Sequence, residues 1–152
     1  MDPDIPLGAL VSIVHRAHFI ALNARMRQYD LSAGQLFALL YLSKRQGTPQ
    51  DALARHFHHN KATIARAIDR LERAGFVRRT VDPENRRAVR LYLTRKGDDI
   101  IPVILAIDRE WEAEICRDLS GDEQNALRQL LHRIAEKSCT LCSPVSGAAD
   151  AD

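Results

Sequence analysis

The feature that most constrains the fold is a capped amphipathic helix followed at once by two short strands. Asn60 is a good N-cap, and Gly75 can end the helix that it starts, so we predict a helix over residues 61–74. Its apolar residues recur at helical spacing: Ile64, Ile68 and Leu71. Residues 76–81 (FVRRTV) and 88–93 (AVRLYL) have the composition of strands, and the segment between them is rich in turn residues. The sequence therefore predicts a helix that leads directly into a β-hairpin.

Two further helices are predicted immediately before this unit. A capping box formed by Ser32 and Gln35 starts a helix that ends near Gly47. Thr48 can cap a short third helix, with Pro49 at its first position. Two short helices joined by a tight turn form a helix-turn-helix, and the hairpin that follows them is a wing.

Longer helices are predicted on both sides of the winged region. Residues 7–29 form one helix, with apolar side chains on more than one of its sides. Thr94 can cap a fifth helix, in which Pro102 should cause a kink, and the capping box of Ser120 and Glu123 starts a sixth. The fold class is therefore mainly α with a small β-wing, a winged helix-turn-helix with N- and C-terminal dimerisation helices.

The predicted domain organisation is one compact domain of four segments. The apolar residues of the first helix, together with those of residues 100–115 and 127–134, should be buried between two copies of the chain. The four segments are an N-terminal dimerisation helix (1–30), the winged helix-turn-helix (31–96), C-terminal dimerisation helices (97–142) and a disordered tail (143–152).

The distribution of charge points to nucleic acid as a partner. The whole chain has a formal net charge of only +2, but residues 61–96 hold 11 Lys and Arg against 4 Asp and Glu, a net charge of +7. Residues 97–152 hold 5 against 12, a net charge of −7. Local positive charge of this kind drives binding to DNA phosphates by releasing counterions, although charge counts alone also fit a solvated surface.

The candidate DNA-binding residues lie on the fourth helix and the wing. On the helix they are Lys61 at its start and five residues on or near the side opposite the apolar stripe: Ala62, Thr63, Arg66, Arg70 and Arg73. An arginine early in a helix inserted in the major groove can bond both acceptors of guanine. The wing contributes Arg86 and Arg87 at its tip, and Arg78, Arg79 and Arg90 on its strands. Such a hairpin can place guanidinium groups in the narrow minor groove.

The segment from Ala67 to Gly97, AIDRLERAGFVRRTVDPENRRAVRLYLTRKG, resembles the signature of MarR-type regulators, and the resemblance extends over about residues 7–137. It implies a dimer in which two winged domains read a pseudo-palindrome. It also implies that Arg87 is the wing-tip arginine of the minor groove. The family usually places an aspartate two residues before this arginine, where this chain has Asn85.

Weaker signals concern effectors and metals. The first helix carries His15, Arg16 and His18, which could hold a small carboxylate, and the resemblance implies small aromatic acids of the salicylate kind. A surface or interface charge explains the same residues. Cys139 and Cys142 have the spacing of half a zinc site but lack two further ligands, so we expect reduced thiols, no bound metal and no cofactor.

Several functional classes are disfavoured by the sequence. No paired nucleophile and base and no glycine-rich phosphate loop is present, so we do not expect an enzyme. We also expect that no apolar run approaches the ~20 residues that a membrane span requires. The N-terminus is unlike a secretory signal, so we expect a cytoplasmic location. The predicted function is a ligand-responsive transcriptional regulator, a repressor that binds pseudo-palindromic double-stranded DNA as a homodimer. A sequence-indifferent architectural DNA binder and a winged-helix protein-interaction module remain the alternatives.

Overall fold

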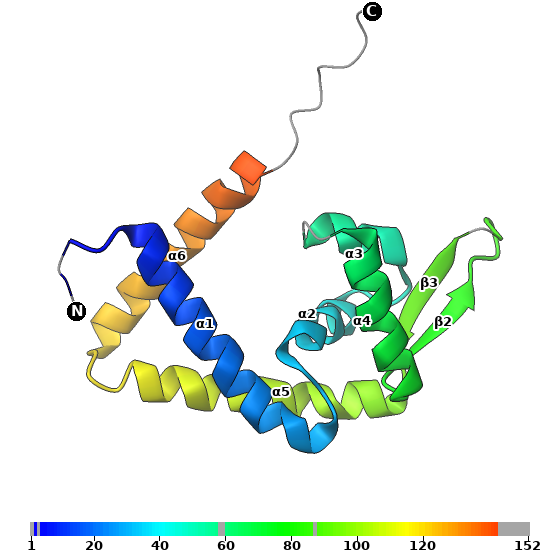
Figure 1. Cartoon of the computed structure of the whole chain (residues 1–152), viewed down its shortest axis with the longest axis horizontal. Coiled ribbons are helices and arrows are strands. Elements are labelled where there is room, and N and C mark those ends of the chain that lie inside the picture. Colours follow the sequence, from blue (N-terminus) through cyan, green and yellow to red (C-terminus); the bar gives the residue numbers. More distant parts are fainter. Residues whose placement is uncertain (1, 3, 58–59, 87, 143–152) are drawn as a thin grey trace, which may run out of the picture. The chain divides into compact units, whose positions relative to one another are not determined.

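The structure, a computed structural model, describes residue 2 and residues 4–57, 60–86 and 88–142. The chain divides into two compact units, Met1–Glu112 and Ala113–Asp152. The first unit contains the helices that precede the wing, the small sheet and most of the helix that follows it, and the second contains the last helix of the chain (Figure 1).

The first unit begins with α1 (Leu7–Met26), which continues as a short 3-10 helix η1 (Arg27–Tyr29). Asp30 then adopts a left-handed conformation with φ of 57°, which turns the chain into the next helix. Within α1 only Leu22 and Met26 are buried. Most of its apolar side chains are therefore exposed in the single chain.

One expectation about this segment was wrong. Leu7–Tyr29 is long and apolar enough, by length and composition, to cross a membrane, although only 6% of its most apolar window is buried. Polar residues are scattered through this segment, so its apolar character appears only as an average over a window of residues. An exposed helix at an oligomer interface has the same length and composition, so these properties alone do not identify a membrane span.

The next helix, α2 (Ala33–Lys44), starts at the predicted capping box. The backbone N–H of Ser32 donates to Gln35 Oε1 at 2.8 Å, and the N–H of Ala33 donates to Asn23 Oδ1 of α1 at 2.9 Å. Half of the residues of this helix are buried, because it packs against α1, α4 and the sheet. It is the central element of the core.

The prediction for Thr48 and Pro49 was wrong. Both residues form a short strand, β1 (Thr48–Pro49), which pairs antiparallel with β3, and Pro49 is the N-cap of the next helix. Gly47, with φ of 74°, turns the chain so that its N–H donates to Leu91 O at 2.9 Å. Proline is tolerated here because β1 is an edge strand.

The helix-turn-helix consists of α3 (Gln50–His56) and α4 (Lys61–Arg73), and it agrees with the sequence prediction. The cap at Asn60 is confirmed, because its side chain accepts the N–H of Thr63 at 2.7 Å. Gly75 follows the end of α4 with φ of 79°. The apolar stripe of α4 is buried: Ile64, Ile68 and Leu71.

The wing is formed by β2 (Val77–Val81) and β3 (Val89–Leu93), which pair antiparallel with Arg79 opposite Leu91. The strand order is β1-β3-β2, so β3 is the central strand. It is therefore hydrogen-bonded both to the other strand of the wing and to the segment that enters α3.

The helix that follows, α5 (Arg95–Ile115), is capped by Thr94, whose Oγ1 accepts the N–H of Gly97 at 3.1 Å. It continues through Pro102. We expected its apolar residues to lie in a dimer interface, but Ile100, Ile104 and Ile107 are buried in the core of their own chain. That part of the prediction was wrong, because the helix faces the core along its first three turns.

The second unit contains the end of α5 and the helix α6 (Gly121–Cys142). The predicted capping box is confirmed, since the N–H of Ser120 donates to Glu123 Oε2 at 2.7 Å. The apolar side chains of α6 are exposed: Leu127, Leu130, Leu131 and Ile134. A stripe of this size on one helix needs a partner surface.

Candidate nucleic-acid interface

The helix α4 buries one side and exposes the other. We call the exposed side the cationic face, and it contains Lys61, Ala62, Thr63, Arg66, Arg70 and Arg73. All of these residues are exposed except Thr63, which is half-buried. Because Ile64, Ile68 and Leu71 fix the opposite side in the core, the cationic face is held outward. A helix held in this way can enter the major groove of DNA.

Some residues of the cationic face have polar contacts within the protein. Arg66 Nη2 donates to Thr63 Oγ1 at 3.3 Å, which directs the arginine toward the start of the helix. Lys61 Nζ lies 2.9 Å from Asp51 Oδ2 of α3, and both side chains are exposed. An exposed ion pair of this kind contributes little to stability, so Lys61 can exchange Asp51 for a phosphate at low cost.

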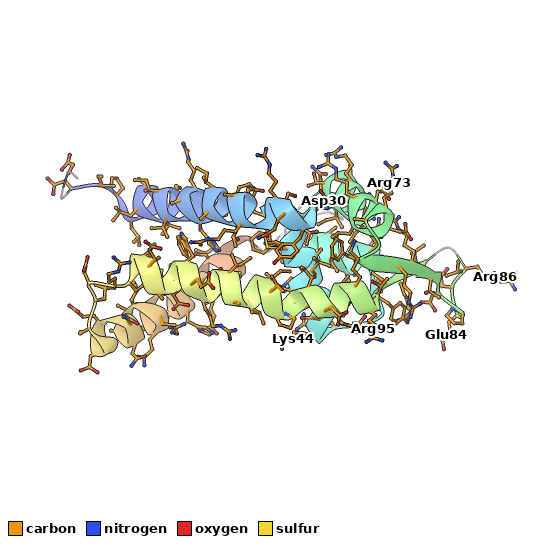
Figure 2. The ribbon with its side chains drawn as sticks, turned by 90° about the horizontal axis from the view of Figure 1, so that it is seen from below. Asp30, Lys44, Arg73, Glu84, Arg86 and Arg95 are labelled. Atoms are coloured by element: carbon orange, nitrogen blue, oxygen red, sulfur yellow. The ribbon has the colours of Figure 1, made fainter. Side chains whose placement is uncertain are left out.

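The tip of the wing presents positive charge away from the core. Arg86 is exposed there, and Figure 2 shows it extending from the hairpin beyond Glu84. Arg87, the predicted minor-groove arginine, lies outside the described residues. The turn itself is closed by the N–H of Asp82, which donates to Ala88 O at 3.0 Å.

Arg90 contacts two groups of the chain beside the turn of the wing. Its Nε donates to Asp82 Oδ2 at 2.7 Å and its Nη1 donates to Gly47 O at 3.2 Å. Asp82 is buried, and the hydrogen bond that it accepts from the N–H of Glu84, followed by the one from Arg90, lowers the pKa of its carboxyl group. The family usually has its acid at the position of Asn85, whereas the acid that braces this wing is Asp82. The role of Arg90 as a DNA contact stays a prediction.

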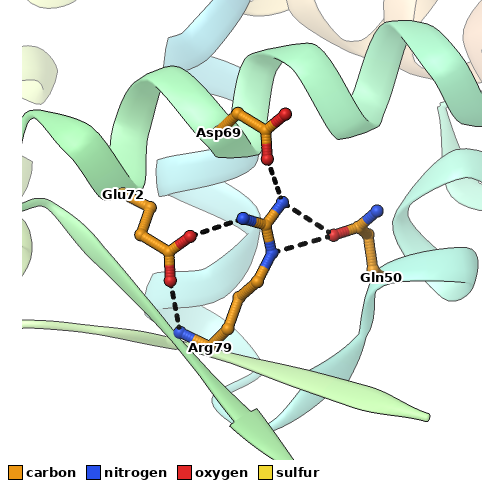
Figure 3. Close-up of polar contacts among 4 residues, drawn as sticks. All are labelled: Gln50, Asp69, Glu72 and Arg79. Atoms are coloured by element: carbon orange, nitrogen blue, oxygen red, sulfur yellow. Dashed lines mark hydrogen bonds and ion pairs between the residues drawn. The ribbon is translucent and has the colours of Figure 1, made fainter. Parts of the chain in front are cut away.

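The two arginines of β2 are also engaged within the chain. The guanidinium of Arg78 lies 4.5 Å from the centre of the Tyr92 ring, and its Nη1 donates to Thr80 Oγ1 at 2.9 Å. Arg79 extends in the other direction, toward Asp69 and Glu72 of α4 and toward α3 (Figure 3). Sequence reasoning counted Arg79 with the arginines of the wing and missed these partners.

The predicted effector residues of α1 do not line either of the two cavities described below. His15 and Arg16 are exposed. His18 Nε2 lies 2.6 Å from Asp108 Oδ1 of α5, and its ring centre lies 4.3 Å from that of Trp111. His18 therefore connects α1 to α5, and a ligand role for these three residues stays a prediction.

Two cavities lie near the end of α1. One of about 480 Å³ is lined by Asn23, Arg27, Asp30, Leu31, Ser32, Gln35 and Arg70. Another, of about 650 Å³, is lined by Gln28, Tyr29, Asp30, Phe76, Arg95, Lys96, Asp99, Ile100 and Val103. Both volumes are in the range of small-molecule sites, and the first includes Arg70 of the cationic face.

Only one member of the predicted cysteine pair has a described side chain. Cys139 is exposed on α6, and the side chain of Cys142 lies outside the described residues. Among the residues that the structure describes, no group of three or more His, Cys, Asp or Glu side chains could hold a metal ion.

A pair of short helices that leads into a β-hairpin and presents an outward cationic face defines a winged helix-turn-helix protein. Comparison with known proteins makes the assignment specific. The model of the MarR family matches residues 31–89. An HTH-type transcriptional regulator of Bacillus subtilis (strain 168), YybA, is 31% identical over 127 residues, which are 82% of this chain and 83% of the relative. The chain belongs to the MarR family of transcriptional regulators.

Solved structures agree with this assignment. A crystal structure of MarR has a TM-score of 0.89 and 41% identity, and the match covers 93% of this chain and 96% of that chain. A MarR family regulator from Listeria monocytogenes, solved in complex with a 26-mer DNA, has a TM-score of 0.80 and 23% identity over 90% of this chain and 91% of its own. The similarity covers nearly the whole chain, so the helices outside the winged region also follow the family. These relatives are transcriptional regulators and not enzymes.

Proposed function

We propose that this MarR-family regulator is a repressor that binds a pseudo-palindromic operator as a homodimer, with α4 in the major groove and the wing in the adjacent minor groove. The observation that carries the proposal is the cationic face of α4, which is exposed while the other side of the helix is buried. The Listeria regulator that was solved with DNA has the same fold, which supports a DNA-binding surface in this position.

Within this proposal α4 identifies bases. Arg66 lies in the second turn of the helix, and its contact with Thr63 Oγ1 reduces the number of conformations that it must give up on binding. Arginine presents two parallel donors, which match the two acceptors of guanine in the major groove. Lys61, at the first position of the helix, has the geometry of a phosphate contact.

The wing anchors the protein. Arg86 at the tip, together with Arg87, provides the positive charge that the narrow minor groove attracts. The brace between Arg90 and Asp82 restrains the two strands of the hairpin relative to each other, which lowers the entropy that the wing has to lose on binding. Contacts of this kind recognise charge and groove width more than the identity of bases.

The exposed apolar residues of α1 and α6 support a dimer. Large side chains exposed in the single chain include Leu7, Val11, Val14 and Ile20 on α1, and Leu127, Leu130, Leu131 and Ile134 on α6. Their burial between two copies would remove apolar area that a monomer leaves in water. Two winged regions about one turn of DNA, ~34 Å, apart could then bind both half-sites and block a promoter in the cytoplasm.

The effector of this class would be a small aromatic carboxylate. Support comes from the cationic residues of α1 and from the cavity of about 480 Å³ lined by Arg27 and Arg70. A ligand that bound beside Arg70 would alter the cationic face, and the loss of DNA affinity would be matched by reciprocal loss of ligand affinity on DNA.

The experiment is selection of bound sequences from a random duplex pool, followed by fluorescence anisotropy on the selected duplex and on a scrambled duplex of equal length and composition. The proposal expects affinity for the selected duplex at least about a thousandfold higher, as is usual for specific regulators. Equal affinity for both duplexes would favour an architectural DNA binder. No binding to either duplex at moderate salt would favour a protein-interaction module.

A further inference from the structure

Arg79 connects three elements of the DNA-binding region. It lies on β2, with its side chain 25% exposed, and its guanidinium contacts Asp69 and Glu72 of α4 and Gln50 of α3 (Figure 3). Nη2 donates to Asp69 Oδ1 at 2.6 Å, and Nη1 donates to Glu72 Oε2. Nε and Nη2 also donate to Gln50 Oε1, at 3.3 and 3.2 Å. We call these four residues the Arg79 cluster.

The cluster is held at the backbone as well as at the side chains. The N–H of Arg79 donates to Glu72 Oε1 at 3.2 Å, so the Glu72 carboxylate accepts hydrogen bonds from both the backbone and the guanidinium of Arg79. Gln50 is the first residue of α3, and Asp69 and Glu72 are one turn apart on α4. Burial alone would lower the pKa of Arg79, but its hydrogen bonds and ion pairs with Asp69 and Glu72 outweigh that effect and raise it. The guanidinium is thus held by groups from all three elements.

The position of the two acids relative to the cationic face gives the cluster a functional meaning. At about 100° per residue, Asp69 and Glu72 lie to one side of Arg66, between the cationic face and the buried stripe. They are the acidic residues of α4, whose bounds are Lys61–Arg73. Without a cation beside them, their charges would repel the phosphates that the helix approaches.

Arg79 has little capacity left for DNA. All three nitrogen atoms of its guanidinium donate to Asp69, Glu72 or Gln50. Removing it from these partners would leave two carboxylates unpaired beside the cationic face. A direct contact between Arg79 and a phosphate would therefore cost the protein the contacts that orient α4.

We infer that Arg79 is a positioning residue for operator recognition: it sets the orientation of α4 relative to the wing and to α3, and it neutralises Asp69 and Glu72, without touching DNA. The inference rests on the proposed function, in which α4 identifies bases. Part of the specificity for the operator would then depend on a residue outside the surface that contacts DNA.

The test compares three variants on the selected duplex and on its scrambled control, each at several salt concentrations. Arg79→Gln removes the cluster, and Asp69→Asn/Glu72→Gln removes its acids. Arg78→Gln is the matched control, because it removes the same charge from the neighbouring residue of β2. The contacts of Arg78 described above are with Tyr92 and Thr80, and neither residue belongs to the Arg79 cluster. Specificity is the ratio of the two affinities, which does not depend on the active fraction of a preparation.

The expected result for Arg79→Gln is a specificity ratio about tenfold lower, with a slope of log affinity against log salt that stays within about 0.3 of the wild type. Asp69→Asn/Glu72→Gln should lower the ratio as well, although it makes the surface more positive and should raise affinity for scrambled DNA. The triple variant should lose no more specificity than Arg79→Gln, because the residues act as one unit. Arg79→Lys, which keeps the charge but not the planar geometry, should fall between the wild type and Arg79→Gln.

Two outcomes would overturn the inference while the proposed function stands. One is a salt slope shallower by about one unit in Arg79→Gln with an unchanged ratio, which identifies a phosphate contact. The other is a wild-type ratio in Asp69→Asn/Glu72→Gln. A wild-type protein that does not distinguish the two duplexes would instead refute the proposed function itself, and this inference with it.

Discussion

Arg90 on the central strand and Asp82 at the end of the wing form an ion pair, with 2.7 Å between Nε and Oδ2, and the same arginine donates to the carbonyl of Gly47. One side chain thus connects the turn of the wing to the glycine that precedes β1. The wing is held beside its turn by a charged pair in which the acid is buried.

This pair should make stability depend on pH. The pKa of Asp82 is lowered below 3.8 in the folded chain, so the ionised form stabilises the fold above about pH 4. That contribution should be lost as the pH falls below 3.8 through the folded pKa. Thermal unfolding of Asp82→Asn should therefore give a lower Tm than the wild type at pH 7, and the difference should shrink toward pH 2. Glu84→Gln, in the same turn, is the control, and a constant difference at every pH would contradict the explanation.

Arg66 and the wing-tip arginines should differ in what they contribute. Arg66→Ala should cost about 1–3 kcal/mol on the selected duplex and much less on scrambled DNA, because a base contact is lost. Arg87→Ala should weaken both duplexes more evenly and make the salt slope shallower by about one unit. Anisotropy titrations at several salt concentrations measure both quantities. The two roles would be reversed if Arg66→Ala left the ratio of affinities for the selected and scrambled duplexes unchanged while Arg87→Ala abolished the preference for the selected duplex.

The dimer should depend on the exposed apolar residues of α1 and α6. Ile20 is 62% exposed and Leu130 is 53% exposed in the single chain. Replacing either by Glu should shift the chain from dimer to monomer in sedimentation velocity at micromolar concentration, since a charge cannot be buried there without a partner. Val81→Glu is the matched control, because Val81 is 56% exposed but lies on the wing. A wild-type chain that binds DNA as a stable monomer would rule out the dimer.

Gly97 should be required for packing between α5 and the sheet. A Cβ at this position would lie 2.2 Å from Phe76 O and 3.2 Å from the Cβ of Leu93. Gly97→Ala should therefore lower the free energy of unfolding by about 1–3 kcal/mol, or the Tm by about 2–12 °C. Gly121→Ala, where no atom lies within 4 Å of the added Cβ, should leave the Tm near the wild type. Equal Tm values for both variants would show that the backbone at Phe76 can move away.

Salicylate should bind at millimolar concentration, raise the Tm and weaken binding to the selected duplex, because both effects follow from preferential binding to one form of the protein. Arg16→Ala tests the site expected from the sequence, and Arg27→Ala tests the cavity of about 480 Å³. Calorimetry reports binding to each variant. Absence of heat with the wild-type chain would remove salicylate as an effector.

The sequence predicted those parts of the fold whose signals are local. Caps at Ser32, Asn60 and Ser120 depend on residues at most three positions away, and each helix begins where its cap predicts. The strand β1 was missed because it has two residues and pairs with Leu91 and Arg90, more than 40 residues further along the chain. No local pattern records such a pairing.

For the site, the sequence predicted the chemistry of the residues better than their partners. The apolar stripe at Ile64, Ile68 and Leu71 correctly fixed which side of α4 faces outward. It did not reveal that Arg79 meets Asp69 and Glu72, because these contacts depend on how the hairpin lies against α4. Nor did it reveal that Arg90 meets Asp82 across the hairpin. Counting arginines therefore does not show which of them already have partners within the chain.

The central place of β3 in the three-stranded sheet has a consequence for the operator. Because β3 is hydrogen-bonded both to β2 and to β1, the wing cannot swing independently of α3. The proposed contacts with the major and the minor groove are therefore made by one rigid unit. The distance between the grooves then has to be adjusted by the duplex. Base-pair steps that bend easily, or at which the minor groove narrows easily, should be favoured at operator positions that no side chain touches. The selected sequences should therefore show base preferences between the contacted positions as well as at them.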